Sequence, residues 1–185
     1  MEAGPHDARF SVVQDGRASH FEPGDGEALL SWPEVGHFIV AHGTTVTMHL
    51  HEGVGDDLAR LPLLGPILGT LLRQRGRIVL HASAVSIEGR VAAFLGHKGY
   101  GKSTTAAALH AHGHPVVTDD ILSVEMGEEN TGTVWPGFSR LSMWPDAASA
   151  VGQDPSTLAA LHERVSKRAV PAREGFAAQR ALALD

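Results

Sequence analysis

The stretch from Gly96 to Ser103 constrains the fold of this chain more than any other. Its sequence, GHKGYGKS, fits the pattern G-x-x-x-x-G-K-[ST] of a phosphate-binding loop. Glycines let such a loop curl so that successive N–H groups point inward at phosphate oxygens. In this pattern Lys102 reaches the outer phosphates, and the Ser103 hydroxyl is offered to Mg²⁺. The stretch therefore predicts a nucleotide-phosphate site.

The residues on either side of the loop support this interpretation. Residues 91–95 are apolar and predict a short buried strand, and residues 104–112 are rich in alanine and predict a helix that stops at Gly113. A loop between a strand and a helix lies where unpaired N–H groups and the helix dipole favour an anion. The expected nucleotide-binding residues are Gly96, His97, Lys98, Gly99, Tyr100, Gly101, Lys102, Ser103 and Thr104.

Composition and charge exclude several other classes of function. The 185 residues are 43% hydrophobic and 19% charged, with a formal net charge of -6, so no basic field indicates nucleic acid as a partner. The absence of cysteine excludes disulfides and thiolate metal sites. The first ten residues, MEAGPHDARF, lack the apolar core of a signal peptide, and the most apolar run, residues 58–72, is too short to cross a bilayer. We expect a cytoplasmic protein without a membrane partner.

The N-terminal part predicts a small antiparallel β layer over residues 1–55. Strands are expected at residues 10–13, 37–41 and 45–51, and in the last of these apolar and polar residues alternate. The stretch that follows the first strand, as far as about Leu30, is rich in Gly, Asp and Glu and predicts a loop.

A second domain, the P-loop core, is expected over residues 56–185. Asp56 and Asp57 predict a cap on a short turn. Pro66 suits the first position of a helix, which is then expected to run to Arg75 and to stop at the following glycine.

The core around the loop predicts strands, a hairpin and a crossover. Strands are expected over residues 77–87 and 90–95, joined by a two-residue turn at Glu88–Gly89. The helix after the loop leads into a further strand over residues 115–124, which implies a right-handed parallel crossover. The carboxyl end of that strand would then carry Asp119 and Asp120 beside the loop.

The C-terminal part is expected to contain short elements. The sequence predicts a polar turn at residues 127–132, a strand within residues 134–143 and a short helix at residues 145–151. Asp154 and Pro155 predict the start of a helix that runs to about Lys167. Residues 168–185 are left without an assignment.

Two carboxylates beside a phosphate loop have a clear chemical use. One can hold Mg²⁺, and the other can accept the proton of an attacking hydroxyl. Asp119 and Asp120 are adjacent on a strand and should face opposite sides, which predicts different roles for them. His81, on the preceding strand, fits either a site residue or a satisfied interior histidine.

The residues around the loop resemble a known kinase family. The stretch Leu80–Val85 (LHASAV), the loop, and the stretch Gly113–Asp120 (GHPVVTDD) resemble the kinase core of HPr kinase/phosphorylases. They are more similar still to the HPr-kinase-like proteins of lasso-peptide gene clusters. The resemblance covers about Gly76–Val124, whereas the N-terminal β layer and the stretch Trp135–Asp146 are similar only loosely.

The resemblance implies a fold, an activity and a set of roles. The fold would be α/β, a mixed sheet with a P-loop as in HPr kinase and PEP carboxykinase, preceded by a small antiparallel β layer. The activity would be ATP- and Mg²⁺-dependent phosphorylation of a serine or similar hydroxyl on a peptide or protein, with a lasso precursor peptide as one candidate. Asp119 would be the catalytic base and Asp120 the Mg²⁺ ligand together with Ser103. His81 and Lys102 would lie at the transferred phosphate.

The chain also departs from that family. HPr kinase/phosphorylases carry a Glu-Ile-Arg-Gly signature after the Asp pair, and here only Ser139-Arg140 remains of it. Phosphorylase activity, hexameric assembly and HPr as substrate are therefore not expected. Two other functions stay open, a regulatory module that binds a nucleotide without transferring phosphate and a metabolite kinase.

The remaining polar and aromatic candidates have simpler explanations. His110, His112 and His114 lack an acidic or thiolate partner at the spacing of a metal site, and His49 and His51 fit an exposed strand face. No basic stripe accompanies the tryptophans, so packing in the core or at a rim is expected for Trp32, Trp135 and Trp144. Phosphate contacts or plain exposure both fit Arg140, Lys167 and Arg168.

Overall fold

The chain is a mixed α/β protein built mostly from strands, in which a small antiparallel sheet precedes the rest. The computed structural model describes residues 10–14, 17–23, 26–128, 131–138, 140–162, 165–172 and 181–184. The chain divides into two compact units, Met1–Arg77 and Ile78–Asp185. The helical segment that follows residue 55 lies in the first unit, so this division falls later than the domain boundary expected from the sequence.

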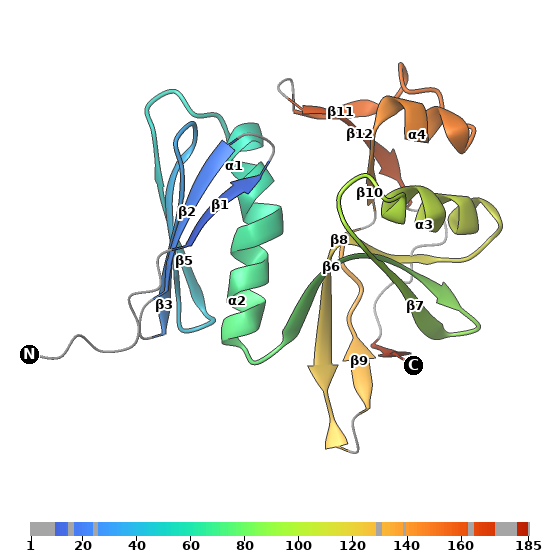
Figure 1. The fold of residues 1–185 in the computed structure, drawn as a ribbon, viewed down its shortest axis with the longest axis horizontal. Coiled ribbons are helices and arrows are strands. Elements are labelled where there is room, and N and C mark those ends of the chain that lie inside the picture. Colours follow the sequence, from blue (N-terminus) through green and yellow to red (C-terminus); the bar gives the residue numbers. More distant parts are fainter. Residues whose placement is uncertain are drawn as a thin grey trace, which may run out of the picture. The chain divides into compact units, whose positions relative to one another are not determined.

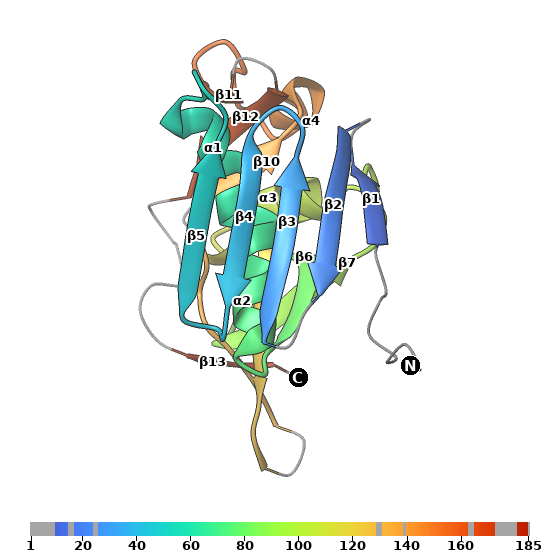
Figure 2. The same cartoon turned by 90° about the vertical axis from the view of Figure 1, so that its left-hand side faces the viewer.

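The first unit contains a five-stranded antiparallel sheet whose strands pair in chain order (Figure 2). The strands are β1 (Phe10–Gln14), β2 (Arg17–Pro23), β3 (Glu27–Trp32), β4 (Gly36–Ala41) and β5 (Thr45–Leu50). The prediction of a loop as far as Leu30 is wrong, because β2 and most of β3 lie in this stretch. In β3, the buried residues Ala28 and Leu30 alternate with Leu29, which is less buried. The stretch as a whole is polar in composition, and this composition concealed the alternation typical of a strand.

A continuous helical segment packs against this sheet. It consists of α1 (Asp56–Pro62), a π-helical turn η1 (Leu63–Ile67) and α2 (Leu68–Gln74). The expected start at Pro66 is wrong, because Leu58 and Ile67 are buried with Phe38 of β4 and so extend the helix in the N-terminal direction. Pro66 lies inside η1, where the wider turn accommodates a residue that has no N–H group.

The two ends of this segment differ in how well the sequence predicted them. Asp56 and Asp57 lie in the first turn of α1 and do not cap it, because the N-cap residue is Gly55 and no side chain bonds there. The C-terminal end is as predicted, since Arg75 is the C-cap and Gly76 follows with a φ of 77°.

The second unit is built around a closed barrel with strand order β13-β7-β6-β8-β9. The strands are β6 (Ile78–Ile87), β7 (Arg90–Leu95), β8 (Val116–Met126), β9 (Gly132–Val134) and β13 (Leu182–Leu184). Only the β13–β7 pair among the described residues of this barrel is parallel. The predicted hairpin between β6 and β7 is confirmed, with φ values of 51° at Glu88 and 84° at Gly89.

The helix α3 (Lys102–Ala111) connects β7 to β8 and packs against the barrel strands (Figure 1). Both β7 and β8 are antiparallel to β6, so they run in the same direction with β6 between them. The β8 strand continues through Met126 because its second half pairs with the start of β6. Asp119 and Asp120 therefore lie in the middle of β8, and their expected place at its carboxyl end is wrong.

The C-terminal elements form a small antiparallel sheet with order β10-β12-β11, together with a short helix. They are β10 (Arg140–Met143), α4 (Pro145–Ala150), β11 (Ala159–His162) and β12 (Val165–Pro171). The helix expected from Asp154 to Lys167 is wrong, because Asp154 accepts hydrogen bonds from the N–H and Oγ of Ser156, at 2.9 and 2.7 Å, and closes a local turn. Of the turn expected at residues 127–132, positions 129 and 130 lie outside the described residues.

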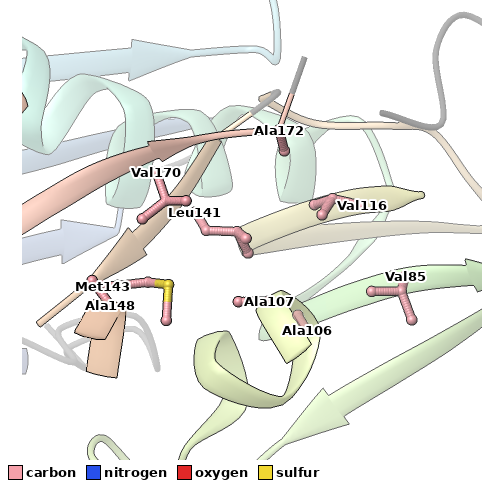
Figure 3. Close-up of a cluster of buried hydrophobic side chains, with 9 residues drawn as sticks. All are labelled: Val85, Ala106, Ala107, Val116, Leu141, Met143, Ala148, Val170 and Ala172. Carbon is pink, nitrogen blue, oxygen red and sulfur yellow. The ribbon is translucent and has the colours of Figure 1, made fainter. Parts of the chain in front are cut away.

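One hydrophobic cluster joins the barrel, α3 and the small sheet (Figure 3). Its buried members are Val85, Ala106, Ala107, Val116, Leu141, Met143, Ala148, Val170 and Ala172. The small side chains of Ala106 and Ala107 let α3 approach the strands closely. This packing fixes α3 and β10 beside β8, which is the arrangement that the site described below requires.

None of the helices in the described ranges is long and apolar enough to cross a membrane.

Candidate functional site

A pocket of about 510 Å³ lies in the second unit, where the glycine-rich loop Gly96–Ser103 meets β6, β8 and β10. Nine of the residues expected in the site line this pocket: His81, Lys98, Gly99, Gly101, Lys102, Ser103, Thr104, Asp119 and Asp120. Three other loop residues, Gly96, His97 and Tyr100, are not among its lining residues. Tyr100 is 76% exposed, and its ring packs edge-on against that of His97.

The backbone of the loop has the curled form that its glycines allow. Gly96, Gly99 and Gly101 have φ values of 151°, 86° and 81°, a region that other residues enter only with strain. Gly101 is the N-cap of α3, and no side chain bonds to this cap. Capping side chains therefore do not occupy the N–H groups of the first turn, which suits an anion at this end of α3.

Lys102 begins α3 and turns back over the loop. Its ammonium group donates to the carbonyl oxygens of Gly96 at 2.9 Å and His97 at 3.2 Å. These are neutral acceptors, so a phosphate oxygen that reached the loop would offer Lys102 a stronger, charge-assisted partner.

Asp119 is the buried carboxylate of the site, with 8% of its surface exposed. Its Oδ1 accepts hydrogen bonds from Ser83 Oγ at 2.5 Å and Ser103 Oγ at 2.8 Å, and its Oδ2 accepts one from Ser142 N at 2.6 Å. These donors come from β6, α3 and β10. A buried charge is tolerated only with such partners, so Asp119 links the three elements around the loop.

Two of these partners were missed by the sequence analysis. Ser83 belongs to the stretch that carries the family resemblance, but only its register opposite Asp119 brings the two side chains together. Its spacing of two residues from His81, which places both on one face of β6, was the available signal. Ser142 acts through its backbone N–H, which no side-chain pattern can indicate.

Asp120 is the exposed carboxylate, paired with His81. Its Oδ1 lies 2.8 Å from His81 Nδ1, and the two side chains are 51% and 53% exposed. The same Nδ1 also contacts the carbonyl oxygen of Asp120 at 3.1 Å. Both partners of Nδ1 are acceptors, so this nitrogen carries a proton. The hydrogen bond to the Asp120 carboxylate raises the pKa of His81, against opposing effects of partial burial and of the Lys102 charge.

A backbone kink brings both carboxylates into the same pocket. Asp120 is opposite Ala82, which is fully buried in the barrel, so a regular strand would aim the Asp120 side chain at the barrel interior. Instead Asp120 has a φ of 95°, which few residues other than glycine adopt. Its side chain therefore lines the pocket beside that of Asp119, and the sequence-based expectation that the two face opposite sides does not hold.

The kink is braced from both sides. Thr118 Oγ1 donates to the carbonyl oxygen of Ile121 at 2.7 Å, which spans the two aspartates. Gly137 lies against Thr118, where an added Cβ would come within 2.3 Å of Thr118 Oγ1, and its N–H donates to the carbonyl oxygen of Val117 at 2.9 Å. Backbone strain of this kind persists only where the surrounding structure holds it.

The pairing of these groups differs from the roles expected for them. The family resemblance implied that Asp120 holds Mg²⁺ with Ser103 and that Asp119 is the base. In the structure Ser103 bonds to Asp119, whereas Asp120 bonds to His81. These contacts favour the opposite assignment.

Most of the other polar candidates are not among the residues that line this pocket. His110 and His112 contact the backbone carbonyls of His114 and Ala108 at 3.2 and 2.8 Å. In the part of the chain that the structure describes, no group of three or more His, Cys, Asp or Glu residues could hold a metal ion. Arg168 bonds to backbone carbonyls of Pro155 and Ser166, but its neighbour Lys167 lines the pocket.

Comparisons of the chain with protein-family models, with curated proteins and with solved structures give no match.

Proposed function

We propose that this protein is an ATP- and Mg²⁺-dependent kinase that transfers a phosphoryl group to a serine or other hydroxyl of a peptide or protein. The observation that carries the proposal is the unequal environment of two adjacent carboxylates beside the glycine-rich loop. Asp119 is buried and accepts a hydrogen bond from the Ser103 hydroxyl, whereas Asp120 is half exposed and pairs with His81. Phosphoryl transfer needs one group for the metal and another for the attacking hydroxyl.

Ser103 and Asp119 are the residues that would hold Mg²⁺. A loop hydroxyl and a neighbouring strand carboxylate are the ligands that nucleotide-bound Mg²⁺ takes in P-loop enzymes, where water and phosphate oxygens complete the shell. The 2.8 Å contact between Ser103 Oγ and Asp119 Oδ1 brings these two oxygens to one point. A site of this kind needs no cluster of three acidic or histidine ligands. When bound, the ion neutralises charge on the phosphates.

Asp120 is the group that would accept the proton of the acceptor hydroxyl. Its carboxylate is half exposed, so an incoming hydroxyl can reach it. The protonated Nδ1 of His81 holds one carboxylate oxygen at 2.8 Å and thereby orients the other. Asp119 is less suited to this task, because hydrogen bonds already occupy both of its oxygens.

Lys102 and the loop would bind the phosphates. The ammonium group exchanges its two carbonyl partners for phosphate oxygens, and the N-terminal turn of α3 adds N–H donors. Lys102→Ala is therefore expected to remove most of the affinity for Mg-ATP while the thermal midpoint of unfolding stays close to that of the wild type.

The acceptor proposed from the family resemblance is a serine of a peptide, and a lasso precursor peptide is one candidate. The test is a single-turnover assay with ATP labelled at its γ-phosphate, Mg²⁺ and serine-containing peptides, in wild type and Lys102→Ala. Transfer by the wild type that Lys102→Ala loses supports a kinase. Tight ATP binding without transfer to any peptide would favour the regulatory module, which binds nucleotide only.

A further inference from the structure

The residues that line the pocket form two chemically different sets. One set is the glycine-rich loop with the polar side chains of β6 and β8 described above. The other set follows from β10 onward and is mainly apolar, with Met143, Trp144, Ala147, Ala150 and Leu161 beside the charged residues Asp146 and Lys167. A nucleotide has the same division, with charged phosphates at one end and a flat, weakly polar base at the other.

Trp144 is the aromatic residue of the mainly apolar set. It is the N-cap of α4 and is followed by Pro145 at the first helical position, so its backbone is held firmly. Trp144 is 40% exposed, whereas the preceding pocket residue, Met143, is buried. A large ring in this position has a face available to a ligand.

Two ammonium groups accompany this ring. Lys98 of the loop lies with its Nζ 5.6 Å from the ring centroid, and Lys167 of β12 lies at 5.9 Å. No basic stripe accompanies Trp144 in the sequence, which predicted a packing role, but the fold brings both lysines to it from distant parts of the chain.

We propose that Trp144 is the stacking surface for the base of the bound nucleotide, and that a purine is favoured because of its larger face. This inference rests on the proposed function, since it assumes that the phosphates bind at the glycine-rich loop. Removing an aromatic ring from a base stack weakens binding by roughly 5- to 150-fold, whereas a cation on an exposed ring contributes only about 2- to 5-fold. The base therefore displaces a lysine from the ring face.

The displaced ammonium group is not left without a role. Lysine is a flexible point charge, and Lys98 belongs to the same loop that would bind the phosphates. Lys98 would thus exchange its ring contact for contacts with phosphate oxygens when the nucleotide binds.

The experiment compares Mg-ATP with Mg-tripolyphosphate, which has the phosphates but no base. We expect Trp144→Leu to weaken ATP by roughly 5- to 150-fold and tripolyphosphate by less than about 2-fold. Trp144→Phe keeps a ring and should retain most of the ATP affinity. Trp135→Leu is the matched control, because Trp135 is 48% exposed and is not among the residues that line the pocket, and it should change neither ligand.

The outcomes separate this inference from the proposed function. If Trp144→Leu binds ATP like the wild type while Lys102→Ala does not, the stacking surface is overturned and the phosphate site stands. Equal losses of both ligands in Trp144→Leu, or an equal loss of ATP in Trp144→Phe, would also overturn it. If the wild type binds neither ligand, the proposed function fails as well.

Discussion

The site has a buried half, Asp119 with its serine partners, and an exposed half, Asp120 with His81. The two aspartates are adjacent in one strand but have opposite environments. Asp119 is 8% exposed and bonds to three donors on three elements, whereas the Asp120 side chain is 51% exposed and bonds to one side chain. A buried carboxylate with a full set of partners holds its surroundings together. An exposed carboxylate contributes little to stability and keeps an oxygen available for chemistry. Substitution of Asp119 should therefore lower the free energy of unfolding more than substitution of Asp120 does.

The largest effect is expected for Asp120→Asn on phosphate transfer. The amide keeps the shape of the side chain but cannot accept the proton of the acceptor hydroxyl, so transfer should fall by about 10²–10⁴-fold. The free energy of unfolding should change by less than about 1 kcal/mol, because the pair with His81 is half exposed. Single-turnover transfer and urea unfolding measure the two quantities. Transfer at the wild-type rate would show that the base is elsewhere.

The next effect is on stability, for Asp119→Ala. The change leaves the buried Ser83 hydroxyl and the partly buried Ser103 hydroxyl and Ser142 N–H without their shared acceptor, which should lower the free energy of unfolding by about 2–4 kcal/mol. Urea unfolding provides the measurement. Ser83→Ala, which removes only one of the donors, is the graded control and should cost about 1–2 kcal/mol. If Asp119→Ala proves no less stable than Asp120→Ala, the contrast between the two halves is wrong.

A third substitution tests the kink that separates the two halves. Gly137→Ala would place a Cβ 2.3 Å from Thr118 Oγ1 and 3.0 Å from Thr118 Cβ, so Thr118 must move away from Ile121. Overpacking of this kind costs about 1–3 kcal/mol, and here it should also slow phosphate transfer because it disturbs the brace of Asp120. Gly55→Ala, where a Cβ meets open space, should cost only about 0.5–1 kcal/mol, which is the preference for glycine over alanine at the N-cap of α1. Adding Thr118→Ala should relieve the clash, and stability that does not recover would contradict this account.

The parts of the site that the sequence predicted depend on local patterns. The loop, the helix after it and the β6–β7 hairpin each follow from turn residues and periodicity within a short stretch. Asp154 and Pro155 show the limit of such patterns, because an Asp-Pro pair begins turns as readily as helices. Pro66 shows a second limit, since a π-helical turn allowed the helix to continue past it.

The pairing within the site could not be predicted, because it depends on residues far apart in the sequence. Ser83 meets Asp119 only through the register of β6 with β8, and Ser142 reaches it only because β10 packs beside that strand. The φ of 95° at Asp120 reverses the direction of its side chain. The alternation of side chains along a regular strand does not predict such a reversal. The residue types of the site are thus evident in the sequence, but their partners are not.

The smallest effect concerns the pH dependence of the exposed half. The pKa of His81 is raised, chiefly by its hydrogen bond to the Asp120 carboxylate. A raised pKa in the folded state means that this contribution to stability is fully present below the ordinary histidine value of about 6.5 and is lost as the pH rises through the raised value. His81→Gln should therefore lower the free energy of unfolding more at about pH 5.5 than at about pH 8.5. The difference should be only about 0.2–1 kcal/mol, because both side chains are half exposed and the pair is screened by solvent.

A double-mutant cycle makes this small effect decisive. In an Asp120→Asn background the cost of His81→Gln should no longer depend on pH through this pair, because the amide carries no charge for the imidazolium to meet. Salt at about 1 M should reduce the difference in the wild-type background in the same direction. Urea unfolding at both pH values gives all the terms of the cycle. A cost of His81→Gln that grows toward alkaline pH, or one that stays the same after Asp120→Asn, would mean that the Asp120 carboxylate does not hold the charged histidine. The exposed half would then lack the charged pairing that orients Asp120 toward an acceptor hydroxyl.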